Sequence, residues 1–400
     1  MTIKKITFAL LSLMALLLMS LSTQAAWFEP GEETKGAAIT TGDTDLNIRV
    51  RLQPRYDHGN LVASRDNKTY STESDLYLRR VRLELTGAFA AKTIKYNLTL
   101  SADKYDKAGN ANALGIQTAF VEWAADPAFS IIAGKEKLPY SRVSLTSSSR
   151  RLLIENPVST ESAKAIFGRS EPYYQPKLAI KGAFLDGVIA YEAAYADGWA
   201  NGDAIQTNSL RTTYTVYRSK PVYALRTEFS PPGWVESKKS DAHLGKGKHL
   251  TLGVDYVEQD DIEYNLTTGT YQESRRLNGI DLSGHYNGIT AQIEYNEWKI
   301  DTLDPRVMGV HPRGWYAQAG YYIDGLRLEP VGRYEFYNQD SKAVSKAERD
   351  YTLGVNWYRM GHSLKFGVNW VRSVYQSNAA GRLANDDKKD VVQAQAQMYY

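Results

Sequence analysis

Three absences narrow the class of this 400-residue chain. It contains no cysteine, so no disulfide can stabilise the folded protein. After residue 26 it has no run of about 20 apolar residues, which a membrane-spanning helix requires. Its six histidines show no metal-ligand spacing, so we expect neither a metal site nor a cofactor. If the chain enters a membrane, we expect it to do so with strands.

The start of the chain has the pattern of a secretory signal peptide. Lys4 and Lys5 precede an apolar run over residues 6–21, and small residues follow as a cleavage site. The alternative is an uncleaved anchor, but polar residues interrupt the apolar run and no basic stop follows it. We therefore predict three parts: a cleaved signal peptide at 1–26, a periplasmic lead-in at 27–45 and one domain at 46–400.

A surplus of charge is also missing. The full sequence has 48 basic and 45 acidic residues, a formal net charge of +3. Loss of the signal peptide removes two lysines and leaves 46 basic against 45 acidic residues, a net charge of +1. This balance argues against a nucleic-acid partner. Any preference for anions must therefore come from the positions of individual arginines.

Aromatic residues and polar/apolar alternation are abundant instead. The chain has 28 tyrosines and eight tryptophans, and its mean hydropathy is −0.44. Residues 391–400 alternate and end on Tyr400, so a strand there would place Gln393, Gln395 and Gln397 on one face and apolar residues on the other. Pairing of this last strand with the first would remove the exposed edge and close a barrel.

The same alternation recurs along the chain, with polar faces dense enough to line a water-filled lumen. Asn-Gly and Asp-Gly turns alternate with long polar loops, as in outer-membrane barrels. Residues 230–248 are the exception, because they are long where a short turn is expected. We predict an all-β fold, a transmembrane antiparallel β-barrel of about 16 strands with a long constriction loop after strand 5. The strands are expected at about 46–57, 75–89, 93–103, 114–124, 129–135, 177–184, 187–195, 210–229, 249–257, 277–286, 289–298, 314–322, 326–337, 350–358, 363–375 and 391–400.

Basic residues on the predicted inner face form the first candidate site. Four arginines on neighbouring strands, Arg49, Arg51, Arg80 and Arg82, outnumber the acids beside them. Arginine suits phosphate because its planar fork donates two parallel hydrogen bonds, and rings of basic residues select anions in pores. The alternative is that these arginines form structural pairs with inward glutamates, and the pattern leaves both readings open.

The longest loop, residues 136–175, is the second candidate site. It combines basic residues with a hydroxyl run at 146–149 and with apolar residues that an extracellular loop would not need. Such apolar anchors predict a loop that folds into the lumen and narrows it, although packing on the outer rim is the alternative. The basic residues in and next to this loop are Lys135, Lys137, Arg142, Arg150 and Arg151.

Three segments resemble one known family. Residues 78–87 (LRRVRLELTG), the segment from 132 to 155 that begins IAGKEKLPYS, and residues 329–336 (EPVGRYEF) are similar to segments of the phosphate-selective porin O/P family. The resemblance implies a sixteen-stranded trimeric channel whose basic residues line a narrow passage for phosphate or polyphosphate. By this resemblance Arg150 is a lumen-facing basic residue and Lys137 lies in the approach to it.

We therefore expect an outer-membrane porin that passes small, phosphate-like anions passively, and not an enzyme. One alternative is a general diffusion porin without phosphate selectivity. The other is a barrel hydrolase using Ser283 and His285, although no nucleophile-elbow motif occurs. The expected partners are small inorganic anions, outer-membrane lipid and lipopolysaccharide, and two further copies in a homotrimer. The expected pore-lining residues are Arg49, Arg51, Arg80, Arg82, Lys95, Lys135, Lys137, Arg142, Arg150, Arg151 and Arg333.

Overall fold

The computed structural model describes ten stretches of the chain. The predicted signal peptide and the lead-in up to residue 35 lie outside them, whereas β1 (Ala37–Thr41) pairs with the first barrel strand inside the predicted lead-in. None of the helices in these stretches is long and apolar enough to cross a membrane. The described residues are 36–63, 70–107, 112–164, 166–167, 173–206, 213–266, 269–302, 309–341, 347–376 and 387–400.

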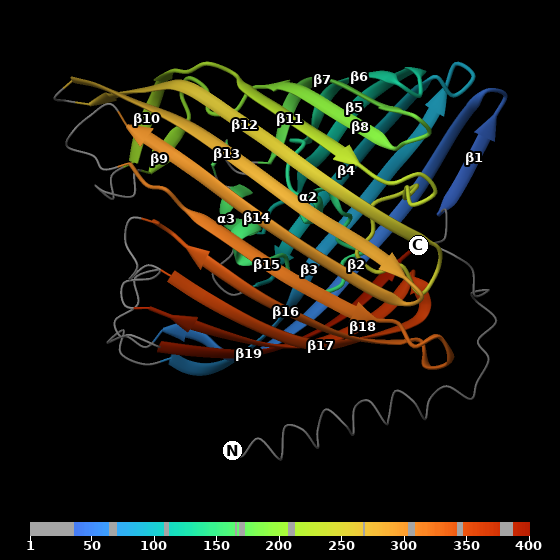
Figure 1. Ribbon diagram of the computed structural model, residues 1–400. Coiled ribbons are helices and arrows are strands. Elements are labelled where there is room, and N and C mark those ends of the chain that lie inside the picture. Colours follow the sequence, from blue (N-terminus) through green and yellow to red (C-terminus); the bar gives the residue numbers. More distant parts are fainter. Residues whose placement is uncertain are drawn as a thin grey trace. The chain divides into compact units, whose positions relative to one another are not determined.

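Sixteen antiparallel strands form a closed barrel, which confirms the predicted fold class (Figure 1). Each barrel strand pairs with the next along the chain, and the last pairs with the first. The barrel strands are β2 (Thr44–Ala63), β3 (Tyr70–Phe89), β4 (Ile94–Tyr105), β5 (Gly115–Asp126), β6 (Phe129–Lys137), β7 (Tyr174–Phe184), β8 (Ile189–Ala196), β11 (Val222–Phe229), β12 (Lys248–Leu266), β13 (Gly269–Tyr286), β14 (Ile289–Thr302), β15 (Arg313–Tyr321), β16 (Leu328–Asn338), β17 (Ala347–His362), β18 (Leu364–Tyr375) and β19 (Asp387–Tyr399).

The C-terminal strand closes the barrel as the alternation of its residues predicts. Met398 pairs with Leu52, and the backbone groups of Tyr400 and Val50 exchange two hydrogen bonds of 2.8 and 2.9 Å. The Gln397 side chain faces inward and is bound to Gln53 across the closing seam, at 2.6 Å. Closure satisfies the edge groups that an open sheet would expose.

The barrel is polar inside and apolar outside. On β13, Asp281 is buried in the interior, whereas Ile280 and Leu282 on either side are exposed on the outer surface. The same pattern, polar inside and apolar outside, holds on β12, where Asp255 is buried and Val254 is exposed. An outer surface of leucine, isoleucine, valine and tyrosine is the surface that a bilayer requires of a barrel.

Two strand predictions need correction. The strand expected at 210–229 is two strands, β10 (Thr213–Arg218) and the barrel strand β11; β10 pairs with the short β9 (Ala204–Gln206) and with β12. The second concerns the strands expected at 249–257 and 277–286: residues 258–275 between them, predicted as a loop, are mostly the extended end of the β12–β13 hairpin. There Ile262 and Tyr264 are buried inside and Glu263 lies on the opposite face, so no apolar outer face marks the strand although the pairing continues.

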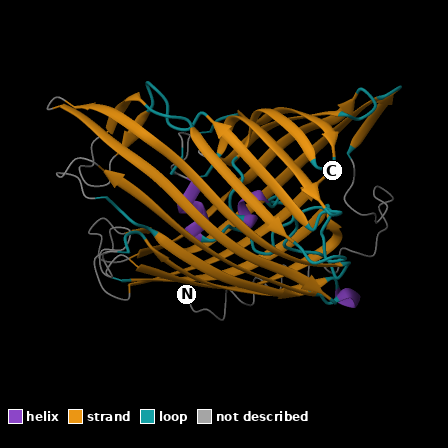
Figure 2. Cartoon of the chain, turned by 45° about the horizontal axis from the view of Figure 1, so that its top comes forward, coloured by secondary structure: helices purple, strands orange, loops and turns teal. Residues whose placement is uncertain are grey.

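Two connecting segments reach into the interior. The longer, residues 138–173, follows β6, the fifth barrel strand, and contains α2 (Arg142–Leu145) and α3 (Val158–Lys164). Both views place these helices within the ring of strands (Figures 1 and 2). The second segment, residues 230–247, connects β11 to β12 at the end where the short turns lie, and the backbone amide of Asp241 donates to the Arg150 carbonyl at 3.1 Å.

Polar contacts fix the longer segment to distant strands. The Ser141 hydroxyl donates to Glu294 on β14, and the backbone amide of Val158 donates to Glu335 on β16, both at 2.6 Å. The apolar residues noted in the sequence pack here, because Leu152 and Leu153 lie in a buried cluster with Val331 and Tyr358. The described residues of this segment are therefore fixed to the inner side of the barrel instead of its rim.

Candidate functional site

A β-bulge adds one arginine to the interior. Gln53 on β2 pairs with Arg80, but the next residue, Pro54, pairs with Leu78, so Arg79 is the extra residue of β3. A bulge changes which face of the strand the neighbouring side chains occupy. Both Arg79 and Arg80 are buried inside the barrel. Strict alternation would have pointed one of them at lipid. Proline cannot donate to the strand ladder and is found at bulges, so Pro54 was the available signal.

A cavity of about 730 Å³ opens between this part of the barrel wall and the interior segment. Its side chains come from β2–β6 on one side and from residues 145–174 on the other, with Lys238 from the second interior segment. The four acidic residues that line it are Glu84, Asp103, Glu136 and Glu161. The nine basic residues are Arg51, Arg79, Arg80, Arg82, Lys104, Lys137, Arg151, Lys164 and Lys238.

The wall arginines are partly neutralised by these acids. Arg51 binds Glu84 at 2.6 Å, and Arg82 binds Asp103 at 3.2 Å. Both also donate to the hydroxyl of Ser148 on the interior segment, at 2.7 and 3.5 Å. Each keeps a buried Nε without a hydrogen-bond partner. The wall arginines are thus held in place while part of their donor capacity stays unused.

Arg151 is the least neutralised of the predicted arginines in the cavity. It is buried on the interior segment, and its Nε and Nη1 have no hydrogen-bond partner in the part of the chain that the structure describes. Its own carbonyl accepts a hydrogen bond from Lys365 on β18 at 2.7 Å, which fixes the backbone at this point. A buried guanidinium with unmet donors is costly unless an anion completes its hydrogen bonds.

Glu155 is the acid that ties the segment to the bulge. Arg79 donates to both of its oxygens, and Arg55 binds it as well. Burial by itself would raise the pKa of Glu155, but the guanidinium groups of Arg79 and Arg55 hold it well below its usual range. Glu155 therefore stays ionised, and Arg79 contributes more to holding the segment than to attracting anions.

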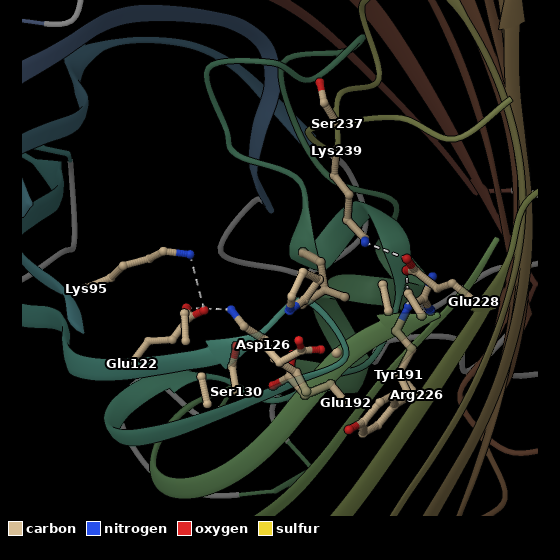
Figure 3. A pocket seen from close by; sticks show the side chains of 18 residues that line it. Lys95, Glu122, Asp126, Ser130, Tyr191, Glu192, Arg226, Glu228, Ser237 and Lys239 are labelled. Atoms are coloured by element: carbon tan, nitrogen blue, oxygen red, sulfur yellow. Dashed lines mark hydrogen bonds and ion pairs between the residues drawn. The ribbon is translucent and has the colours of Figure 1, made fainter. Parts of the chain in front are cut away.

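A second cavity, also of about 730 Å³, lies at the short-turn end (Figure 3). Its basic side chains are matched by acids: Lys181 binds Glu122 at 2.7 Å and Lys239 binds Glu228 at 2.6 Å. Four basic and four acidic residues line it in all, namely Lys95, Lys181, Arg226 and Lys239 with Glu122, Asp126, Glu192 and Glu228. Of these two cavities, only the first carries an excess of positive charge.

The structure brings together five of the eleven pore residues predicted from the sequence. Arg51, Arg80, Arg82, Lys137 and Arg151 all line the first cavity. The sequence analysis did not include Arg79, Lys104, Lys164 or Lys238, which also line it. Alternation along single strands could not show that residues of two separate interior segments meet at one wall.

The other six predicted residues lie elsewhere. Arg49 pairs with Glu84 at 3.5 Å beside the cavity, and Lys95 lines the second cavity. Lys135 lies on the face of β6 opposite the buried Ile132 and donates to the Ile116 carbonyl at 2.7 Å. The remaining three belong to the support of the interior segments: Arg142 binds Glu236, Arg333 binds Glu335 at 2.6 Å, and the Arg150 carbonyl accepts from the backbone of residues 241 and 242.

Ser283 and His285, which the sequence suggested as an alternative catalytic pair, are not hydrogen-bonded to each other in the described part of the chain. Ser283 lies 3.3 Å from Nε2 of His249, and Nδ1 of His249 lies 3.0 Å from Nδ1 of His285. In a serine hydrolase a carboxylate orients the second nitrogen of the base. Here another histidine occupies that place, an arrangement unlike that of a hydrolase.

Comparison with known proteins identifies relatives in sequence and in fold. The family model described as phosphate-selective porin O and P matches residues 48–400. A protein of Aquifex aeolicus described as uncharacterized is 36% identical over 353 residues, covering 81% of each chain. Three solved structures share the fold at low identity. They are an anion-selective porin from Comamonas acidovorans (12% identity, TM-score 0.64, 89% of this chain and 100% of that one), Salmonella typhi OmpF with daunomycin (11%, 0.59, 91% and 100%) and the trimer form of Vibrio cholerae OmpT (7%, 0.57, 90% and 100%).

Proposed function

The chain belongs to the phosphate-selective porin O and P family, and from this premise we propose that it is a passive outer-membrane channel that prefers phosphate-like anions. The observation that carries the proposal is the first cavity, where nine basic residues face four acidic ones. Fixed positive charge in a narrow, low-dielectric passage raises the local concentration of anions and replaces part of their hydration.

Arginine favours phosphate over chloride within this cavity. Arg51, Arg82 and Arg151 each keep at least one donor nitrogen without a hydrogen-bond partner among the described residues. A phosphate presents several acceptor oxygens and can bind such forks at two points, whereas chloride has no directional acceptors. In this proposal Arg51, Arg80, Arg82, Lys137 and Arg151 bind the passing anion, and residues 138–173 narrow its path.

A general diffusion porin is the second candidate, favoured by the balanced charges of the second cavity. Bilayer recordings separate the two functions. We expect reversal potentials in asymmetric KCl to show chloride preference, and added phosphate to reduce the chloride current at millimolar concentration. Chloride preference without phosphate block would establish the general porin, and cation preference would contradict both forms of the proposal.

The cellular setting belongs to the same proposal. The sequence before residue 27 directs export by a cleaved signal, and the apolar outer surface contacts outer-membrane lipid and lipopolysaccharide. The trimer form described for Vibrio cholerae OmpT, which shares the fold, supports a homotrimer here. Chemical cross-linking of the protein in native membranes, followed by electrophoresis, tests the trimer directly.

A further inference from the structure

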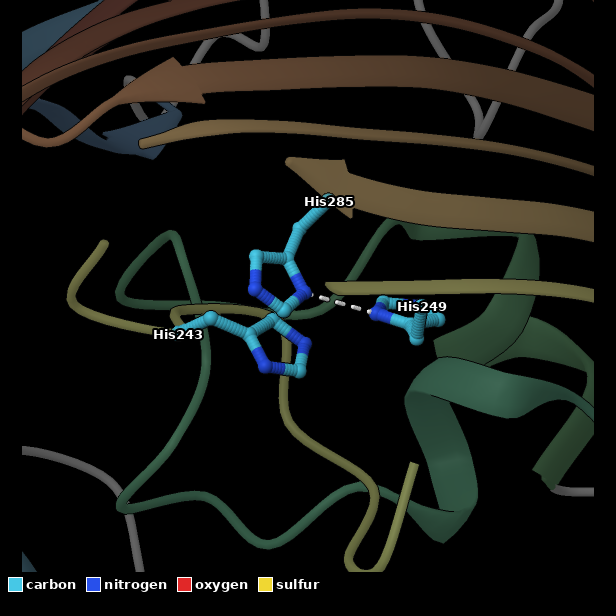
Figure 4. Close-up of side chains that lie close together, drawn as sticks. All are labelled: His243, His249 and His285. Carbon is cyan, nitrogen blue, oxygen red and sulfur yellow. Dashed lines mark hydrogen bonds between the residues drawn. The ribbon is translucent and has the colours of Figure 1, made fainter. Parts of the chain in front are cut away.

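Three histidines meet at the short-turn end of the barrel (Figure 4). His243 belongs to the interior segment 230–247, His249 to β12 and His285 to β13. One ring nitrogen from each lies within 4.8 Å of the other two. The rings of His243 and His285 stack with centroids 3.7 Å apart. The cluster thus joins an interior segment to two neighbouring strands of the wall.

A second bulge brings the two wall histidines opposite each other. His249 pairs with His285 in the ladder, but the register shifts by one residue between Gln259 and Ile262 farther along the same hairpin. Without that shift His249 would pair with Tyr286. The spacing of the histidines in sequence therefore gave no indication of the site.

The hydrogen-bond partners of the Nε2 atoms leave the Nδ1 atoms of His249 and His285 available to a ligand. Nε2 of His285 is bound to the Lys246 carbonyl, which can only accept, so this nitrogen carries the proton and Nδ1 has a free lone pair. Nε2 of His249 is held by Ser283 at 3.3 Å. The two Nδ1 atoms lie 3.0 Å apart and share either a proton or a metal ion. Ligand histidines typically have their second nitrogen held by a carbonyl in this way.

His243 supplies an independent sign of a missing ligand. Its Nε2 atom is buried without a hydrogen-bond partner among the described residues, and 12% of its side chain is exposed. The nearest carboxylate, Glu236, is 3.9 Å away and is already bound by both terminal nitrogens of Arg142. An unmet buried nitrogen costs stability, and a cation at the centre of the cluster would offset that cost.

We propose that His243, His249 and His285 bind one divalent transition-metal ion of the class that prefers imidazole, such as Zn²⁺ or Ni²⁺. Three neutral imidazoles suit these ions, and zinc binds histidine nitrogen at about 2.0–2.1 Å, which places tetrahedral ligands about 3.3 Å apart. The three ligand nitrogens already lie within 4.8 Å of one another, so small side-chain movements complete the site. The bound ion fastens residues 230–247 to the wall, and those residues in turn contact the longer interior segment through Arg142 and Glu236.

The test measures Zn²⁺ binding to the folded full chain, without a histidine tag, by equilibrium dialysis and elemental analysis. We expect one ion per chain. His243→Asn and His285→Asn should each weaken binding at least tenfold, whereas His311→Asn should not, because His311 lies apart, beside Asp301 at 3.2 Å. The heat-dependent shift of the folded barrel in gel electrophoresis shows whether each variant folds, and His243→Asn changes an interior segment instead of the wall.

A spectroscopic measurement distinguishes this site from adventitious surface binding. Co²⁺ should give the visible absorption bands of a low-symmetry nitrogen site, and Zn²⁺ should remove them at one equivalent. Loss of these bands in folded His243→Asn, but not in His311→Asn, supports the three-histidine site. Equal binding by wild type and folded His243→Asn, or no binding by folded wild type with metal in excess, overturns the proposal.

Discussion

Arg79 and Glu155 form a bidentate ion pair inside the barrel, with Nε of Arg79 2.6 Å from Oε1 and Nη2 3.0 Å from Oε2 of Glu155. The arginine is the extra residue of a bulge in the wall, and the glutamate belongs to the segment that crosses the interior. The bulge in the wall and the segment that crosses the interior therefore stabilise each other. The pair fixes the distance between the wall arginines and Arg151, on which the proposed anion site depends.

Replacing Glu155 by Gln should loosen the segment most at neutral pH. Breaking one side of a buried ion pair costs about 3 kcal/mol in unfolding free energy, because the guanidinium groups of Arg55 and Arg79 lose their partner. The folded pKa of Glu155 lies well below its usual range. Its stabilisation is therefore complete above an unfolded pKa of about 4.3 and is lost as the pH falls through the lower folded value.

Denaturant titrations of wild type and Glu155→Gln at several pH values measure this difference. The gap between the two proteins should be widest at pH 7 and should close as the pH drops well below 4.3. A gap that is independent of pH would mean that the ionisation of Glu155 contributes nothing to holding the segment.

Replacing Arg151 by Gln should lower anion preference several-fold. Its guanidinium has two unpartnered nitrogens in the cavity with the positive excess, so its charge is available to a passing ion. The matched control is Lys239→Gln, which removes the same charge from a lysine paired with Glu228 in the balanced cavity. Zero-current potentials in asymmetric KCl provide the measurement, and equal shifts in both variants would contradict a filter at Arg151.

Replacing Arg82 by Lys should separate charge from geometry. The charge remains, so chloride preference should change little, but the fork that matches phosphate is lost. A lost hydrogen bond to a charged group is worth about 1.5 kcal/mol, which corresponds to phosphate block about tenfold weaker. Titration of phosphate against chloride current measures the change, and an unaltered block would exclude Arg82 as a phosphate ligand.

Replacing Leu152 by Ala should widen the passage by loosening the interior segment. Leu152 is fully buried against Val331 and Tyr358, and truncation of such a leucine costs about 2–5 kcal/mol. We expect larger and noisier single-channel currents and faster proteolysis within residues 138–173. Leu185→Ala, at an exposed turn with 71% of the residue accessible, is the control and should leave the current unchanged. Currents as quiet as those of wild type would show that this cluster does not hold the segment.

Much of the fold follows from local pattern. The alternation in residues 391–400 and in the first strand predicted a closed barrel. A two-residue period indicates which face of a strand contacts lipid and which contacts water, and it does so for each strand separately. The apolar residues of the long connection likewise predicted burial. The same logic failed at 258–275, where no apolar outer face marks the strands, and at 210–229, where the pattern did not show the break between β10 and β11.

The functional sites depended on relationships that no local pattern contains. A bulge turns Arg79 inward, and the register shift in the β12–β13 hairpin sets His249 opposite His285. Contacts between segments far apart in the chain determine which arginines are neutralised. Composition and periodicity were enough to predict a barrel with basic residues inside. Whether a given arginine holds the structure together or remains available to an anion was settled by cross-strand register and long-range contacts, because a charge acts according to its neighbours in space.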